Sequence, residues 1–192
     1  MTPYLFDHLD ALALLVKKGP LGVFLDFDGT LSLLVPDPEQ AQIDPACREA
    51  LALLARRLAL VAVVSGRRAE HLRQKVGLDA VVYSGNHGLE RWEDGSLRVH
   101  PVAAVAQESV AQVCREVLPV AAEHNVYVED KGPLVGFHYR PAPDWEQARR
   151  ALLRELEPRC RARGLTLYQG IALIEVRPPM PVSKGTAVRE LA

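Results

Sequence analysis

The chain has 192 residues, of which 48% are hydrophobic and 24% charged, and its formal net charge is -1. These values are those of an ordinary globular protein, long enough to bury a substantial core as one domain or two small ones. A net charge this close to zero provides no field that would concentrate nucleic acid or an anionic membrane surface, so neither is expected as a partner.

The cysteines and the start of the chain bear on location. Cys47, Cys114 and Cys160 are odd in number and lack the close pairs that zinc sites and redox dithiols use. This usage favours the reducing cytoplasm. Residues 1–10 show no basic region followed by an apolar stretch, and the most apolar run, 58–64, is too short to cross a bilayer. We therefore expect a cytoplasmic protein.

The first half of the chain alternates between helix and strand signals. Helical spacing of apolar residues, short apolar runs, and start or stop residues such as Asp44, Pro45 and Gly19 mark the segments. In chain order they predict a helix over 5–18, a strand over 21–25, a helix after Asp44, a strand over 60–64, a helix over 69–76 and a strand over 80–83.

This alternation with short connections predicts an α/β fold, a Rossmann-like sheet of parallel strands with helices on both faces. Ligands of such sheets bind at the carboxyl ends of the strands. Polar clusters follow the predicted strands at 26–30, 65–67 and 84–88. We therefore expect a site at this edge.

The pattern changes near residue 102. The predicted order becomes helix 102–125, strands 126–128 and 134–139, helix 144–163, and strands 165–168 and 171–176. Two helices over an antiparallel sheet make a small α+β unit, and no linker or repeat sets it apart. We expect residues 1–101 and 178–192 to form the core and residues 102–177 an inserted cap over the site.

Asp26 and Asp28 are the strongest catalytic candidates. They stand two positions apart where the first strand ends, so both carboxylates can converge on one point. Their repulsion would be relieved by a hard cation such as Mg²⁺, which binds carboxylate and phosphate oxygens. One aspartate can then attack phosphorus while the other exchanges protons with the leaving oxygen and with water. A hairpin turn is the alternative, since Asp28-Gly29 is also a strong turn signal.

Two other segments carry phosphate-binding signals. Ser65 and Gly66 follow the second strand, where a hydroxyl and loop amides can hold a phosphate oxygen. Lys184 starts a short helix after Ser183, and a lysine at that positive helix end is misplaced unless an anion lies nearby. A helix-capping serine and a solvated surface lysine remain the alternatives.

The predicted cap carries charged groups on or beside its short strands. These are Glu129, Lys131, His138, Arg140, Glu175 and Arg177. Such a mixture of donors and acceptors can bind a polyhydroxylated ligand, although a charged strand end is usually just solvated, and for this cluster alone solvation is the better explanation.

Taken together, these segments resemble the haloacid dehalogenase superfamily: residues 26–30 correspond to its first motif, Ser65 to its second and Lys184 to its third. More narrowly, the segments Val-Ser-Gly-Arg at 64–67, Gly-Asn-His-Gly-Leu-Glu at 85–90, Glu-Asp-Lys-Gly at 129–132, His-Tyr-Arg at 138–140 and Ile-Glu-Val-Arg-Pro at 174–178 resemble the trehalose-6-phosphate phosphatases. The resemblance runs from about residue 22 to the last residue.

The resemblance implies hydrolysis of trehalose 6-phosphate, a small-molecule sugar phosphate, to trehalose and phosphate in trehalose biosynthesis. It makes Asp26 the nucleophile and Asp28 the general acid/base, with both carboxylates holding Mg²⁺. Ser65, Gly66 and Lys184 would bind phosphate. The implied sugar-binding residues are Asn86, His87, Glu129, Lys131, Arg140 and Glu175, and His87 can equally be a satisfied core histidine.

Two expectations concern what lies beyond this resemblance. Family members continue after the third motif to a Gly-Asp-Asp type motif with further metal ligands, so we expect a core that is incomplete at the carboxyl terminus. A missing C-terminal segment or a second chain would then be a partner. The alternatives are another sugar-phosphate phosphatase, a phosphomutase with the same nucleophile motif, or a non-catalytic sugar-phosphate-binding protein.

Overall fold

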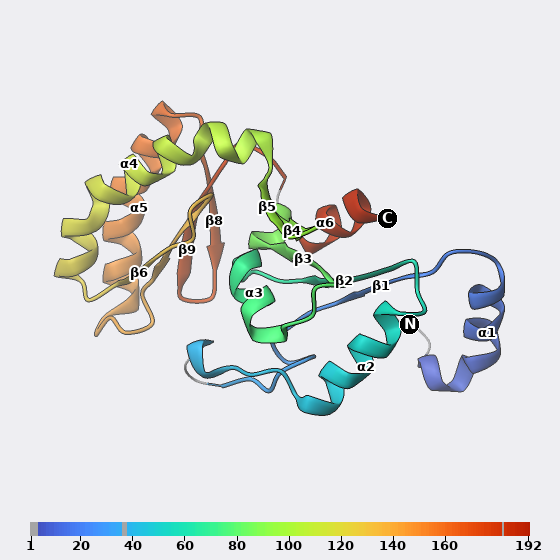
Figure 1. Ribbon diagram of the computed structural model, residues 1–192. Helices are drawn as coiled ribbons and strands as arrows, with labels where there is room; N and C mark the ends of the chain where they lie inside the picture. Colours follow the sequence, from blue (N-terminus) through green and yellow to red (C-terminus); the bar gives the residue numbers. More distant parts are fainter. Residues whose placement is uncertain (1–3, 36–37, 182) are drawn as a thin grey trace.

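The structure is a computed structural model and describes residues 4–35, 38–181 and 183–192 (Figure 1). It contains two sheets, each with its own helices. No helix in the described part of the chain combines the length and the apolar character that a membrane span requires.

The first sheet is built mainly from the first half of the chain. Its elements and their flanking helices are η1 (Leu5–His8), α1 (Leu9–Lys17), β1 (Gly22–Leu25), η2 (Pro38–Gln40), α2 (Pro45–Ala55), β2 (Leu60–Val64), α3 (Ala69–Val76), β3 (Val82–Gly85), η3 (Asn86–Gly88), β4 (Glu90–Glu93) and β5 (Ser96–Val99). The strand order is β1-β2-β3-β4-β5. Strands β1, β2 and β3 pair in parallel, which confirms the predicted α/β class.

Strands β4 and β5 were not predicted. They form an antiparallel hairpin that joins the sheet beside β3, so the sheet is mixed rather than wholly parallel. The hairpin turns at Asp94 and Gly95, both of which have positive φ angles, as an Asp-Gly hairpin turn requires. Asp28-Gly29, the pair with the same turn signal, instead lies in the loop after β1.

Alternating side chains of β2 anchor helices on both faces of this sheet. Val61 and Val63 pack in one apolar cluster with Leu51 of α2 and Leu72 of α3. The intervening residues of β2 face the opposite cluster, which contains Ala187 of helix α6 (Lys184–Leu191). Figure 1 shows α2 and α3 on one side of the strands and α6 on the other. The sheet is therefore covered on both faces, as predicted.

The second unit contains α4 (Pro101–Glu123), β6 (Tyr127–Asp130), β7 (Val135–His138), α5 (Trp145–Ala162), β8 (Thr166–Gly170) and β9 (Leu173–Arg177). Its antiparallel strand order is β6-β7-β9-β8. Both helices lie on one face of this sheet (Figure 1), where side chains such as Phe137 and Ile174 join their apolar cluster. The other face is polar. The assignment of 102–177 as a separate cap stays a prediction.

Gly85, at the end of β3, provides a direct test of how tightly the first sheet packs against α3. A Cβ atom at this position would lie 2.1 Å from the backbone nitrogen of Ala69 and 2.7 Å from the carbonyl oxygen of Arg67. Because backbone cannot move away as a flexible side chain can, Gly85→Ala should lower the free energy of unfolding by at least about 1–3 kcal/mol.

Urea unfolding measures this change, and Gly22→Ala is the matched control. A Cβ atom at Gly22 meets no atom closer than 3.5 Å, so the control should stay near the parent protein. Equal stability of the Gly85→Ala variant and the control would show that this contact is not as tight as the structure indicates.

Candidate active site

Asp26 and Asp28 lie in a compact loop directly after β1. The backbone N–H of Phe27 donates to Oδ1 of Asp26 at 2.8 Å. Phe27 stands between the two aspartates in sequence, and its side chain is fully buried. The loop folds back because the N–H groups of Leu31 and Ser32 both donate to the Phe27 carbonyl oxygen. Both carboxylates therefore stay at the carboxyl edge of the sheet.

Lys184 compensates the charge of Asp26. Its Nζ forms an ion pair with Oδ2 of Asp26, although the two residues lie 158 positions apart in sequence. Lys184 starts α6, and the hydroxyl of Ser183 caps that helix by accepting from the N–H of Thr186 at 3.0 Å. The lysine at this positive helix end is thus paired with a carboxylate, so Asp26 is an anion beside it of the kind that the sequence analysis called for.

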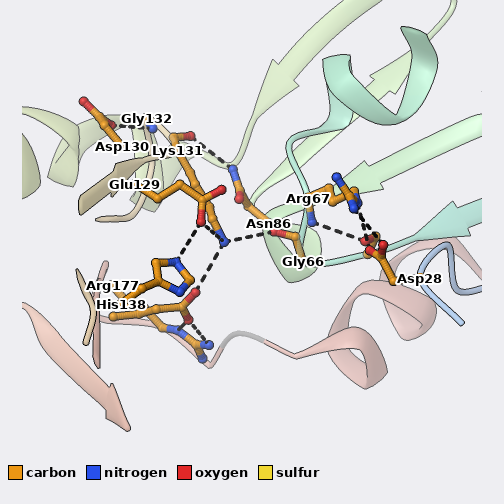
Figure 2. A network of polar contacts seen from close by, with 12 residues as sticks. Asp28, Gly66, Arg67, Asn86, Glu129, Asp130, Lys131, Gly132, His138 and Arg177 are labelled. Carbon is orange, nitrogen blue, oxygen red and sulfur yellow. Dashed lines mark hydrogen bonds and ion pairs between the residues drawn. The ribbon is translucent and has the colours of Figure 1, made fainter. Parts of the chain in front are cut away.

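Arg67 compensates the charge of Asp28. Its Nε donates to Oδ2 at 2.8 Å and its Nη2 donates to Oδ1 at 2.7 Å, so the ion pair is bidentate (Figure 2). The hydrogen bond and the charge of Asp28 raise the pKa of Arg67 above its usual value, against the opposing effect of burial. The sequence analysis gave Arg67 no role, and only its place directly after Ser65 and Gly66 marked it.

The ring of His87 packs against the loop after β2, at Gly66. Ser65 is buried, and its Oγ accepts from the N–H of Arg67 at 3.2 Å. A Cβ atom at Gly66 would lie 2.9 Å from the His87 ring, so this close approach requires glycine. Burial lowers the pKa of His87, which is therefore neutral near pH 7. His87 lines the cavity and supports the loop at the same time.

Glu90 supports the same loop from inside the protein. Its Oε2 accepts from the N–H of Ala69, the first residue of α3, at 3.0 Å, and its side chain is almost fully buried. Burial raises the pKa of Glu90, and the hydrogen bond from Ala69 and the charge of Arg68 offset this only in part.

The second sheet contributes the opposite wall. Glu129 of β6, His138 of β7 and Glu175 of β9 lie on its polar face and line the same cavity as Asp26 and Asp28. Lys131 reaches across to the first sheet, where its Nζ donates to the Gly66 carbonyl oxygen at 3.4 Å (Figure 2). The cavity has a volume of about 410 Å³.

A third wall comes from the loop between β1 and α2. Leu34, Val35 and Glu39 of this loop line the cavity, and the sequence analysis did not single them out. Lys75 of α3 anchors the loop by donating to the carbonyl oxygens of Glu39 and Ala41, at 2.8 Å and 3.1 Å. The loop is thereby fixed against the first sheet.

Two of the predicted sugar-binding residues do not line this cavity among the described residues. Asn86 is fully buried behind it, and its Nδ2 donates to the Lys131 carbonyl oxygen at 3.2 Å. Arg140 lies beyond the end of β7, where the chain turns through a hydrogen bond from the N–H of Ala142 to the Tyr139 carbonyl oxygen. The strand alternation that would carry Arg140 to the polar face has ended there.

Residues 24–192 match the family model for trehalose-phosphatase. The chain belongs to the trehalose-phosphatase family.

Trehalose-phosphate phosphatase of Mycobacterium tuberculosis is 38% identical over 188 residues, which cover 93% of this chain and 46% of that protein. The C-terminal domain of Candida albicans trehalose-6-phosphate phosphatase is 27% identical with a TM-score of 0.74, covering 100% of this chain and 67% of that one. A haloacid dehalogenase-like hydrolase from Bacteroides thetaiotaomicron shares the fold at 14% identity and a TM-score of 0.58, covering 90% and 76%. The chain spans about half the length of the curated relatives it matches.

Glu90 gives this site a stability signature that depends on pH. Its pKa is raised in the folded protein above the usual value of 4.5, so the folded state binds the proton more tightly. Stability from this group is therefore present below the usual pKa and is lost as pH rises through the raised one. Glu90→Gln should destabilise the protein less above this interval than below it, because only the parent loses stability when its buried carboxyl group ionises.

Urea unfolding of parent and variant on both sides of that interval measures the effect. Glu93→Gln, at the other end of the same strand β4 and only half-buried, is the control. A stability difference for Glu90→Gln that does not change with pH would contradict the assignment.

Proposed function

We propose that this protein hydrolyses trehalose 6-phosphate to trehalose and phosphate in the cytoplasm, through an aspartyl-phosphate formed at Asp26. The observation that carries the proposal is one cavity with acidic and phosphate-binding candidates on the first sheet and polar side chains of the second sheet opposite them. Membership of the trehalose-phosphatase family supports the substrate class.

On this proposal, Asp26 attacks phosphorus and Asp28 exchanges protons. Asp26 lies beside Lys184, which can attract the phosphate and bring it to the carboxylate. Asp28 first protonates the leaving sugar oxygen and then takes a proton from the attacking water. Arg67 holds both oxygens of Asp28, so this ion pair must loosen before Asp28 can carry a proton to the leaving oxygen.

Ser65 and Gly66 are proposed to complete the phosphate site. They lie in the loop after β2, and the Ser65 hydroxyl already bonds within that loop. The same hydroxyl can still donate to a phosphate oxygen, because a hydroxyl group can donate one hydrogen bond while it accepts another.

We propose Mg²⁺ as the cofactor. Two carboxylates within one cavity provide the hard oxygen ligands that Mg²⁺ prefers together with substrate phosphate, so Asp26 and Asp28 would hold it. Among the described residues no cluster of three or more histidine, cysteine, aspartate or glutamate side chains could hold a metal ion. When bound, the ion would neutralise charge on the phosphoryl oxygens.

The sugar is proposed to bind against the second sheet. Lys131 forms ion pairs with Glu129 at 3.4 Å and with Glu175 at 3.6 Å, so donors and acceptors for hydroxyl groups lie side by side. Asn86, His87 and Arg140 stay predictions as sugar-binding residues, and of these only His87 lines the cavity among the described residues.

Removing the proposed nucleophile tests this function. Asp26→Asn should abolish phosphate release from trehalose 6-phosphate, because an amide cannot form the aspartyl-phosphate. Asp28→Asn should slow turnover by roughly 10²–10⁴-fold, the usual loss when acid/base assistance is removed. Phosphate release assays with Mg²⁺ measure both changes.

Asp79 lies outside this proposal, and Asp79→Asn, in the exposed turn after α3, is the matched control. It should keep the parent rate. Hydrolysis by Asp26→Asn at the parent rate would show that Asp26 is not the nucleophile.

A further inference from the structure

The polar face of the second sheet has a gap at its centre. Glu129, Gly136 and Glu175 form one row across β6, β7 and β9, because Gly136 pairs with Glu129 on one side and with Glu175 on the other. Side chains alternate along a strand, so His138 lies on the same face, two residues further along β7. The glycine therefore leaves open space between two carboxylates.

His138 reaches across this space to Glu129. Its Nε2 lies 2.9 Å from Oε2 of Glu129, and Nζ of Lys131 lies 3.4 Å from the same oxygen (Figure 2). Within the described part of the chain, both polar contacts of the Glu129 carboxylate are made by Oε2. Oε1 is left to accept from a ligand.

These contacts also settle the charge of Glu129. Burial raises its pKa, but the hydrogen bond from His138 and the charge of Lys131 more than offset this, so the pKa lies below its usual value. Glu129 is therefore an ionised acceptor near neutral pH, and its orientation depends on His138.

Gly136 is required by space and not by backbone conformation. Its φ lies outside the left-handed region that favours glycine. A Cβ atom there would lie 3.1 Å from Nε2 of His138 and 3.4 Å from Cδ1 of Leu173. The imidazole would have to shift at the very atom that contacts Glu129.

We propose that His138 is a positioning residue that fixes the Glu129 carboxylate for binding the sugar, and that glycine at position 136 is what allows the imidazole to reach it. The proposal rests on the proposed function for the identity of the sugar. Its chemistry is that of a preoriented carboxylate that accepts hydrogen bonds from sugar hydroxyls, with no contact to the phosphate.

Steady-state kinetics on the full chain test this role. His138→Ala should raise KM for trehalose 6-phosphate about tenfold, the size of a lost hydrogen bond to a charged group, with little change in kcat. For p-nitrophenyl phosphate, which lacks the sugar, neither constant should change. His138→Gln should recover part of the loss, because its amide N–H can still donate to Glu129.

Gly136 is tested through a double-mutant cycle. Gly136→Ala alone should also raise KM for trehalose 6-phosphate, but it should add little in the His138→Ala background, because it acts through that side chain. Gly170→Ala in β8 is the matched control, since its Cβ atom would meet no atom closer than 3.4 Å and none of His138. Additive effects of Gly136→Ala and His138→Ala, or equal losses for both substrates, would overturn the proposal.

A second readout separates this inference from the proposed function. The imidazole nitrogen NMR signals of His138 should move in the same direction in Glu129→Gln and in Gly136→Ala, and stay unchanged in Gly170→Ala. If the parent protein released no phosphate from trehalose 6-phosphate, the proposed function would fail while these signals still decided the contact. Unchanged signals in Gly136→Ala would overturn it whatever the activity.

Discussion

The two carboxylates of Asp26 and Asp28 follow one strand two positions apart, and like charges this close destabilise each other unless cations compensate them. The fold supplies one cation to each from a different element. Lys184 comes from the start of α6, and Arg67 from the loop after β2. Arg67 reaches Asp28 because the loops after neighbouring parallel strands meet at the carboxyl edge of the sheet, whereas Lys184 arrives there on a helix that follows the second sheet. The charged edge of the first sheet is thus stabilised by two ion pairs that join segments far apart in sequence.

The second sheet meets a different constraint, since its two faces have opposite chemistry. One face packs with α4 and α5 in an apolar cluster, while the other presents Glu129, His138 and Glu175 to the cavity. Lys131 joins these acids to the Gly66 carbonyl oxygen of the first sheet. The wall proposed to hold the sugar is therefore also a direct contact between the two units.

Much of the fold could be predicted because the strands of the first sheet are short apolar runs and its helices have clear start and stop residues. The hairpin of β4 and β5 was missed although Asp94-Gly95 signals it, because its strands, Glu-Arg-Trp-Glu and Ser-Leu-Arg-Val, lack the apolar runs that mark β1 and β2. Asp28-Gly29 carries the same dipeptide, and only the buried strand before it indicates a different role.

The site could be predicted in part for a similar reason. Residues at strand ends, such as Asp26 and Ser65, follow from the position of the strands. Contacts between distant segments do not: the pairing of Arg67 with Asp28 and the reach of His138 over Gly136 depend on three-dimensional register. Arg140 shows the same limit, since a sequence pattern cannot tell where β7 ends and the chain begins to turn, and its role in sugar binding stays a prediction.

The central claim is that a carboxylate at the end of β1 attacks phosphorus first, and that water then attacks the resulting aspartyl-phosphate. The most direct test is hydrolysis of trehalose 6-phosphorothioate, made chiral at phosphorus by sulfur and two oxygen isotopes, in water enriched in the third oxygen isotope, so that the released thiophosphate is itself chiral. Each in-line displacement inverts phosphorus, so attack by Asp26 followed by attack by water predicts net retention of configuration. Net inversion, the result of a single direct attack by water, would contradict the account.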